Sequence, residues 1–564
     1  MKNFNSILAV VFIFLATSCQ KDFLSGQPFS TTTTDNFYKT PEDIEQALVG
    51  CYAILNAGGH GGFYNQQFPT LGTAGTDEMV TDESKMKANF SPIGLAAWNS
   101  QTGFITEVWS YLYIGINRCN TLLEKIENVD LDSERKAQII AEARFLRGLE
   151  YLYLGMMYGG VPVVTVSNPD LNLPRNSTEE VFGQSFADLE FAYNNLNPTP
   201  SMLGRATKYA AAGLLAKAYE FAASCKNNNV NKDLNFPLND FDWANSEDLY
   251  QKALVLTTDI INSGQYKLID NYDYLFRETT KSSQYQEFVF NTESSSDPAN
   301  GNQPSYQSTL IPRGNNSKYG GGTCRILPTG ELFAKYSPEV IGDVYLDFRK
   351  SWNFSDKIKG HVYEVVEGVG YYVPDKLKIP KPNQSPSKTV ASKIFYGSKF
   401  RYRDPKLKNF STHNTDDNFP ILRYAEVLLL HAEAIHFTSG NDDEARSFLS
   451  QIRRRAISPT LTSMADRDTA LQELNAAYTK TDFVEELLDE RARELCYEGS
   501  RHFDLTRFGK YVETIDGLTT DRSLGFNNTA VTAVQLNFTP NKIWFPIPFD
   551  QLLIQSALEQ NPGY

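Results

Sequence analysis

The sequence has few of the residues that catalytic and metal centres commonly use. Only six histidines occur among 564 residues, and the six cysteines include no Cys-x-x-Cys pair. His431 and His436 lie one residue further apart than the i,i+4 spacing that places two zinc ligands on one helical face. The chain also lacks a Gly-x-Ser-x-Gly nucleophile turn, and Gly58–Gly62 lacks the Gly-Lys-Ser/Thr ending of a phosphate loop. We therefore predict no catalytic residue, no metal site and no cofactor.

The sequence also lacks an excess of basic residues. Lys and Arg total 53 against 67 Asp and Glu, which gives a formal net charge of −14, and no basic run is interleaved with aromatics. Such a chain repels a phosphate backbone, so we exclude nucleic acid as a partner. Aromatic residues are plentiful, at 13% of the chain, and 30 of them are tyrosines. Tyrosine has an apolar ring and a polar tip, which suits wet, polar ligands such as sugars or peptides.

An apolar run at the amino terminus is too short to span a membrane, which takes about 20 residues. Lys2 precedes the run 7–15, and Ala16-Thr17-Ser18-Cys19 follows it. The segment 15–19 resembles a bacterial lipobox with one extra residue, which predicts a signal peptide at 1–18 and a lipid on Cys19. The alternative is an ordinary secretory signal that leaves Cys19 as a plain thiol. Residues 19–40 then form a tether.

Apolar residues at three- and four-residue spacing predict a mainly α protein. In Ala141–Val164 they lie on one helical face, and Gly159-Gly160 with Pro162 ends the helix. The sequence Ser177-Thr178-Glu179-Glu180 predicts a capping box. We expect helices at 41–55, 105–126, 133–158, 177–196, 207–223, 243–262, 420–437, 442–456 and 482–499. Their lengths and pairing resemble tetratricopeptide hairpins, although no clean 34-residue period is present.

Two stretches without helical periodicity are the predicted binding regions. We expect 66–103 to be a long ordered loop and 281–418 to be a loop-rich insertion, because binding residues collect in such segments. Aromatic rings there could pack on sugar rings while nearby polar groups bind hydroxyls. For any one of these residues, core packing is an equally good interpretation. The candidate ligand contacts are Asp77, Glu78, Trp98, Asn99, Tyr306, Tyr319, Trp352, Tyr371 and Tyr372.

Two charged clusters could be mistaken for functional centres. Glu490, Glu494 and Glu498 follow one another at one-turn spacing, with arginines interleaved. We interpret this cluster as a buried ion-pair network, although sequence alone leaves open whether two carboxylates face each other across a glycosidase cleft. Asp416-Asp417 could bind Ca²⁺ through oxygen ligands, but the glycine of an EF-hand loop is absent and plain turns are the commoner origin of such pairs.

Several blocks resemble the SusD/RagB family, the lipid-anchored nutrient-binding proteins of Bacteroidetes outer membranes, and they occur in the family's order. The resemblance extends from the lipobox to the last residue. The blocks are EARFLRGLEYLYLGMMYGGVPVV, LPRNSTEEVFGQSFADLEFAYNNLNP, GRATKYAAAGLLAKAYEFAA, KALVLTTDIINSGQYKLIDNYDYLF, RYAEVLLLHAEAI, ERARELCYEGSRHFDLTRF and FPIPFDQLL with the terminal QNPGY.

The resemblance implies a SusD-like fold, with an N-terminal helical-repeat region at 41–280 and a loop-rich region with C-terminal helices at 281–564. It also implies a protein without enzymatic activity, anchored in the outer membrane and facing the exterior. Such a protein binds a glycan and delivers it to a TonB-dependent, SusC-like transporter barrel. Two alternatives remain open at this stage: a RagB-like binder of peptides and an extracellular glycosidase.

Overall fold

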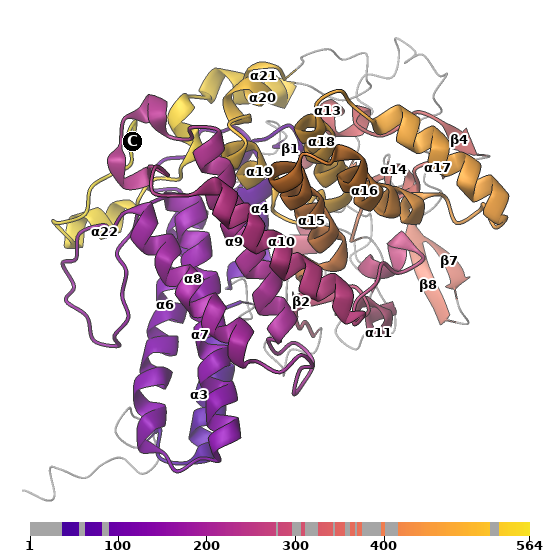
Figure 1. Cartoon of the computed structure of the whole chain (residues 1–564). Coiled ribbons are helices and arrows are strands. Elements are labelled where there is room, and N and C mark those ends of the chain that lie inside the picture. The colour runs from indigo at the N-terminus through magenta and orange to yellow at the C-terminus, as the bar shows by residue number, and fades with distance from the viewer. Residues whose placement is uncertain are drawn as a thin grey trace, which may run out of the picture.

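The computed structural model shows a mainly helical protein, as the sequence predicts (Figure 1). It describes residues 37–55, 62–81, 89–277, 280–295, 306–310, 325–341, 344–355, 361–366, 369–374, 396–400, 416–518 and 529–564. The predicted signal peptide, Cys19 and the tether up to residue 36 lie outside these ranges. Among the described residues, no helix is both long enough and apolar enough to cross a bilayer.

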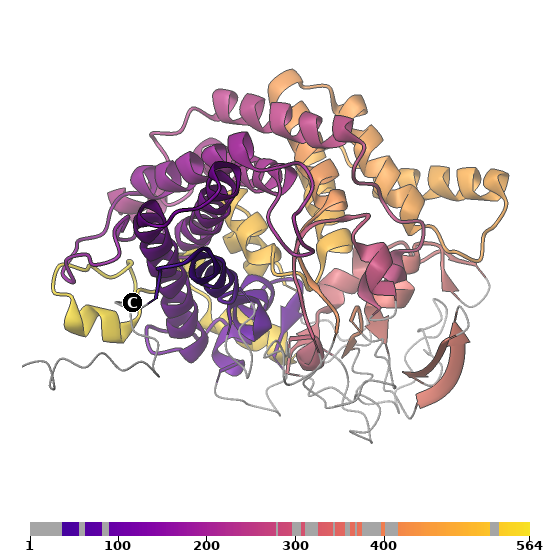
Figure 2. The same cartoon turned by 90° about the horizontal axis from the view of Figure 1, so that it is seen from below.

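Six long helices in the first half pack in chain order, each antiparallel to the one before (Figures 1 and 2). Ser177 forms the predicted capping box, and Gly159 ends the central helix at a φ of 77°, as predicted. Thr40 forms a further capping box, which was not predicted. The helices are α3 (Pro41–Tyr52), α6 (Gly103–Lys125), α7 (Ser133–Tyr158), α8 (Thr178–Asn195), α9 (Lys208–Asn227) and α10 (Ser246–Ser263).

Small residues allow these helices to approach one another closely. Gly148 on α7 faces Leu189 of α8, and Gly155 faces Phe182, where an added Cβ would lie 2.8 Å from the ring. A side chain larger than hydrogen would therefore force the two helices apart. The alanine-rich α9 is buried along nearly its whole length.

The stack continues directly from α10 to α15 (Tyr424–Ser439), so the segment 281–418 is an insertion between two neighbouring helices. Beyond α15 the chain forms α16 (Asp442–Ala456), α17 (Met464–Tyr478), α18 (Phe483–Leu495), α19 (Arg501–Arg507), α20 (Tyr511–Asp516), α21 (Thr529–Asn537), the 3₁₀ turn η11 (Pro540–Ile543) and α22 (Phe549–Ile554). One large hydrophobic core joins residues from Ile44 to Leu558.

The insertion carries short elements around its loops. The helices are α11 (Lys281–Gln284), α12 (Tyr306–Leu310), α13 (Gly330–Ala334) and α14 (Phe348–Asn353). Antiparallel strand pairs join β1 (Met79–Val80) to β3 (Leu327–Pro328), β2 (Phe288–Thr292) to β10 (Phe419–Arg423), and β4 (Val340–Ile341) to β5 (Val344–Tyr345). Two further pairs join β6 (Phe354–Ser355) to β9 (Tyr396–Gly397) and β7 (His361–Val366) to β8 (Val369–Pro374).

Three predictions of local structure are wrong. Residues 420–423 form the strand β10, because Pro420 has no amide proton and the segment pairs with β2 before α15 begins at Tyr424. The helix α17 was not predicted, since only Ala470, Leu474 and Tyr478 of it are buried and its apolar stripe is weak. The first predicted loop contains a π-helical turn η1 (Phe63–Gln67) and the short helices α4 (Phe68–Thr73) and α5 (Ser91–Gly94).

Candidate functional site

The predicted ligand contacts are distributed between the core and the surface. Trp98 is only 2% exposed and packs against Phe545, and its indole Nε1 donates a hydrogen bond of 2.9 Å to the Tyr564 hydroxyl. Lys542 Nζ lies 5.1 Å from the same ring and donates to the Trp98 carbonyl. Trp98 therefore fixes the C-terminal segment to the body, as the core-packing alternative predicts, and does not form part of a surface platform.

Trp352 and Tyr306 are also buried. The indole of Trp352 donates from Nε1 to the Lys399 carbonyl at 2.9 Å, and Arg277 lies over its ring. Tyr306 packs edge-on against Phe400 and Phe419. Their position in Gly- and Asn-rich sequence did not indicate exposure, because the short helices α12 and α14 turn their aromatic faces inward.

Asp77 and Glu78 are buried carboxyl groups with protein partners. Asp77 accepts two hydrogen bonds of 2.7 Å from the Arg501 guanidinium. Burial raises the pKa of Glu78 to about 8, so this side chain is largely protonated at neutral pH. Glu78 also accepts a hydrogen bond from the backbone amide of Tyr497, whose φ of 66° lies in the left-handed region. The pair therefore stabilises the turn that follows α18.

Of the remaining candidates, Asn99 lies at the surface, Tyr371 and Tyr372 belong to a strand, and Tyr319 lies outside the described residues. Asn99 is exposed, and its side-chain oxygen accepts a hydrogen bond from the Gln101 amide near the start of α6. Tyr371 and Tyr372 are in the strand β8, where they pair in register with Glu364 and Tyr363 of β7. The predicted aromatic residues whose side chains the structure describes, Trp98, Trp352 and Tyr306, are buried and so form no surface platform.

The charged cluster on α18 is a buried ion-pair network, which confirms the sequence interpretation. Glu494 is fully buried and accepts hydrogen bonds from Arg349 (2.9 Å), Arg423 (2.6 Å) and Arg455. These three arginines come from α14, β10 and α16. Glu494 thus joins the insertion to the helices that follow it.

Glu490 has the same role one turn earlier. Its carboxylate accepts from Arg349 at 2.8 Å, Arg453 at 2.9 Å and Arg493 at 2.7 Å. Burial alone would raise the pKa of both carboxyl groups, but the surrounding guanidinium groups outweigh burial and hold each pKa far below its ordinary value. Both groups are therefore anionic near neutral pH and cannot act as general acids.

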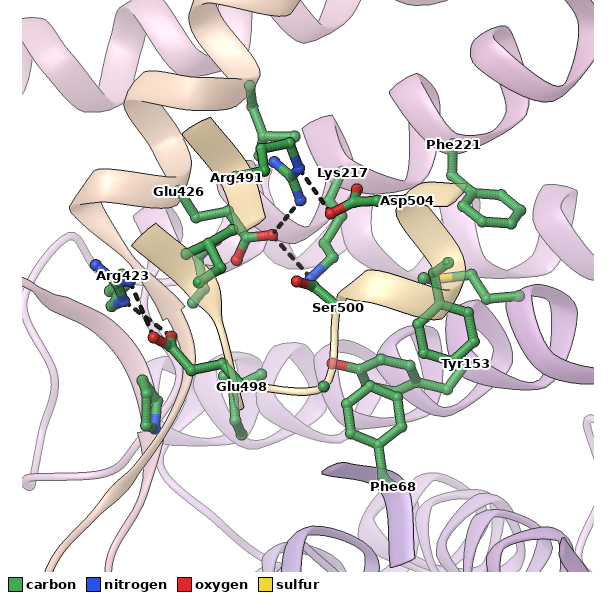
Figure 3. A pocket seen from close by; sticks show the side chains of 18 of the residues that line it. Phe68, Tyr153, Lys217, Phe221, Arg423, Glu426, Arg491, Glu498, Ser500 and Asp504 are labelled. Atoms are coloured by element: carbon green, nitrogen blue, oxygen red, sulfur yellow. Dashed lines mark hydrogen bonds and ion pairs between the residues drawn. The ribbon is translucent and has the colours of Figure 1, made fainter. Parts of the chain in front are cut away.

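Figure 3 shows a cavity beside this network with both charged and apolar lining, where Arg491 bridges Glu426 and Asp504. Lys217 on α9 forms a second ion pair with Glu426 at 3.0 Å, and Phe68 lies on the opposite wall. The cavity volume is about 30 Å³. That space holds about one water molecule and no sugar ring. The side chains of the family-like blocks thus build an internal framework here.

A larger opening lies at the surface, beside Asp77. This charged cleft has a volume of about 250 Å³ and is lined by residues of α13, α18, α19 and α20. Sequence reasoning identified only Asp77 among its charged residues. Lys335, Lys480 and Asp489 were missed because each is an ordinary surface-type residue, and their proximity depends on contacts between distant segments.

Three comparisons with known proteins agree with this architecture. A family model described as "SusD family" matches residues 286–564, and one described as "Starch-binding associating with outer membrane" matches residues 22–219. The chain is 25% identical to the starch-binding protein SusD of Bacteroides thetaiotaomicron, over 100% of this chain and 98% of that protein. It is 26% identical to the SusD-like protein P38 of Formosa agariphila, with both chains fully covered.

Solved structures share the fold. A SusD homologue from Bacteroides thetaiotaomicron superposes with a TM-score of 0.72 at 20% identity, covering 94% of this chain and 98% of the other. Surface glycan-binding protein A from the same organism, solved in complex with laminarihexaose, gives a TM-score of 0.65 at 19% identity and covers 93% and 100%. With its stacked helices, its inserted region and its matches in both halves, this chain belongs to the SusD family.

Proposed function

We propose that this protein is a non-catalytic glycan-binding lipoprotein on the outer surface of the outer membrane. The observation that carries the proposal is the full-length similarity to a protein named for starch binding, together with the shared fold of a glycan-binding protein solved with laminarihexaose. The acidic residues of α18 fit this function, because arginines hold Glu490 and Glu494 as buried anions and leave them no role in sugar hydrolysis.

We place the ligand on the inserted region 281–418 and the adjoining first loop. The insertion leaves the stack between α10 and α15, so its loops can change without disturbing the packing of these helices. The hairpin β7–β8 lies at the edge of the molecule and carries Tyr371 and Tyr372 (Figure 1). Together with Tyr319 and the exposed Asn99, these tyrosines are the candidates for stacking on sugar rings and binding hydroxyls.

Attachment and delivery complete the proposal. A lipid on Cys19 would hold the body at the membrane through the tether 19–40, and the first described helix begins directly after it at Pro41. The bound glycan would pass to a TonB-dependent, SusC-like barrel in the same membrane. Binding energy alone is needed for this role, since the transporter supplies the translocation.

Calorimetric titration tests the binding step. The purified chain is titrated with laminarihexaose, maltohexaose and an unrelated hexapeptide. We expect saturable heat with a glycan and none with the peptide. The double variant Tyr371→Ala/Tyr372→Ala should weaken glycan binding by about tenfold or more, because stacking contributes about 1 kcal/mol per ring.

The matched control is Tyr111→Ala, which removes a partly exposed tyrosine from α6 in the helical stack. It should bind as the parent does. Binding of the peptide alone would contradict the glycan assignment. Unchanged glycan binding by the double variant would move the site away from the β7–β8 hairpin.

A further inference from the structure

The charged cleft beside Asp77 is a second pocket with its own chemistry. Leu488, Leu505 and Leu518 contribute a little apolar lining, since each is at most 5% exposed. We call the five charged residues Arg501, Asp77, Lys335, Asp489 and Lys480 its first wall, and Lys510 and Glu513 at α20 form a separate ion pair in the lining. These residues are far apart in the chain, so the pocket depends on the tertiary structure and not on any single loop.

Charges of opposite sign alternate along the first wall. Arg501 binds Asp77 at 2.7 Å, and Lys335 lies 3.5 Å from the same carboxylate. Lys335 also binds Asp489 at 2.7 Å, and Asp489 in turn binds Lys480 at 2.6 Å. The wall is thus a row of five groups in the order cation, anion, cation, anion, cation.

The outer end of this row is open to solvent. The side chains of Arg501 and Asp77 are about 5% exposed or less, whereas Asp489 is 14% and Lys480 is 40% exposed. Burial opposes ionisation of Asp489, but Lys335 and Arg493 outweigh it and hold the pKa of that carboxyl well below its ordinary value. Asp489 is therefore ionised near neutral pH and accepts hydrogen bonds.

The summed charge of the cleft excludes strongly charged ligands. Four cationic and five acidic side chains line it. The acidic groups would repel a polyanion, and the lysines and Arg501 would repel a polycation. Neither class of ligand therefore gains a net electrostatic attraction. A neutral ligand that both donates and accepts hydrogen bonds can instead satisfy adjacent groups of opposite sign.

A sugar hydroxyl has this double capacity, because it donates one hydrogen bond and accepts others. Two neighbouring hydroxyls could donate to Asp489 while accepting from Lys480 and Lys335. We propose that this cleft binds one neutral sugar residue through its hydroxyls, as a site separate from the aromatic loops. The proposal rests on the glycan-binding function proposed above.

The cleft should bind weakly. Its lining residues, all within the described part of the chain, include no aromatic ring on which a sugar could stack. Hydrogen bonds to groups that water already solvates add little net free energy each. We therefore expect a dissociation constant of about 1 mM or weaker for a single sugar, which suits a holding site that releases its ligand readily.

Saturation-transfer NMR on the full chain tests the proposal with free D-glucose, D-galactose, D-glucuronate and spermine as separate probes. We expect transfer to one or both neutral hexoses and much less to glucuronate and spermine. The variant Lys480→Ala should reduce the hexose signal by about fivefold, because one net hydrogen bond contributes about 1 kcal/mol. Lys510→Ala removes another cation that lines the cleft and should also reduce the signal.

The matched control is Lys252→Ala, which removes an equally exposed lysine from an ion pair on α10. It should leave the hexose signal unchanged, as should Tyr371→Ala/Tyr372→Ala. If hexose transfer survives in both Lys480→Ala and Lys510→Ala, the proposed sugar site in the cleft is wrong. Preferential transfer to glucuronate or spermine would also contradict the proposal.

The two proposals fail in different ways. If the parent binds laminarihexaose by calorimetry but gives no Lys480-dependent hexose signal, the proposal that the cleft binds sugar is wrong and the glycan-binding function stands. If hexose binds at the cleft and no oligosaccharide binds the chain, the proposed function is wrong. If neither class of sugar binds, both are wrong.

Discussion

The buried carboxylate of Glu494 gives the sharpest test of the structural framework. Its replacement by glutamine keeps the shape of the side chain and removes the charge that Arg349, Arg423 and Arg455 share. All four side chains are at most 3% exposed, so water cannot replace the missing charge without opening the core. We expect Glu494→Gln to be strongly destabilising.

The magnitude follows from the burial of the partners. Removal of one member of a buried ion pair costs about 3–5 kcal/mol, because the remaining charge is left uncompensated. Here three guanidinium groups lose a shared anion, although Glu287, Glu490 and Glu498 stay in place near them. These neighbours keep the expected loss of unfolding free energy within that range, at about 4 kcal/mol.

Urea denaturation followed by far-ultraviolet circular dichroism measures the loss. The control is Glu127→Gln, which breaks an exposed ion pair to Lys136 at 2.9 Å. Exposed pairs contribute about 0–1 kcal/mol, so the control should denature almost as the parent does. If Glu494→Gln also costs less than about 1 kcal/mol, the network is not holding the insertion to the helices.

Other residues yield further expectations. Burial and the charge of Glu433 raise the pKa of Glu220 well above its ordinary value, so the folded protein keeps a proton that the unfolded chain loses above about pH 4.5. Through this group the stability of the parent should therefore fall as pH rises above that value, by up to about 1.4 kcal/mol per pH unit, and in denaturation series at different pH Glu220→Gln should remove this contribution and leave that of Glu78. Trp98→Ala should lower the unfolding free energy by about 3–5 kcal/mol because packing is lost. The folded fraction should still bind glycan in calorimetry. A loss of glycan affinity without a loss of stability would instead indicate that Trp98 contacts the ligand. In Gly72→Ala the added Cβ would lie 2.0 Å from the Gly499 carbonyl oxygen. We therefore expect about 3 kcal/mol of destabilisation in the same denaturation assay. A near-neutral result would contradict the packing of α4 on the turn after α18.

The sequence predicted the helical stack well because its signals are local. The helix Ser133–Tyr158 has the predicted bounds, and Ser177 forms the predicted capping box with Glu180. Interleaved arginines and glutamates at helical spacing likewise indicated the buried network on α18, since both periodicity and charge neutralisation are visible in one short segment.

The candidate site could not be predicted in the same way. Exposure of an aromatic residue depends on what packs over it, and Trp98 is covered by Tyr564 and Phe545 from the far end of the chain. The charged cleft likewise joins Asp77, Lys335 and Asp489, which no sequence spacing relates. Composition indicated loops suited to a ligand, but it did not indicate which side chains face outward.

The most direct test of the glycan-binding claim is one titration that measures both the heat of binding and the chain length of the recovered sugar. The full chain is titrated calorimetrically with a panel of neutral oligosaccharides that includes laminarihexaose, and the sugar is recovered afterwards and its chain length determined. We predict saturable binding to at least one glycan, with the recovered sugar unchanged in length. Progressive shortening of the sugar, or no binding to any glycan in the panel, would contradict the account.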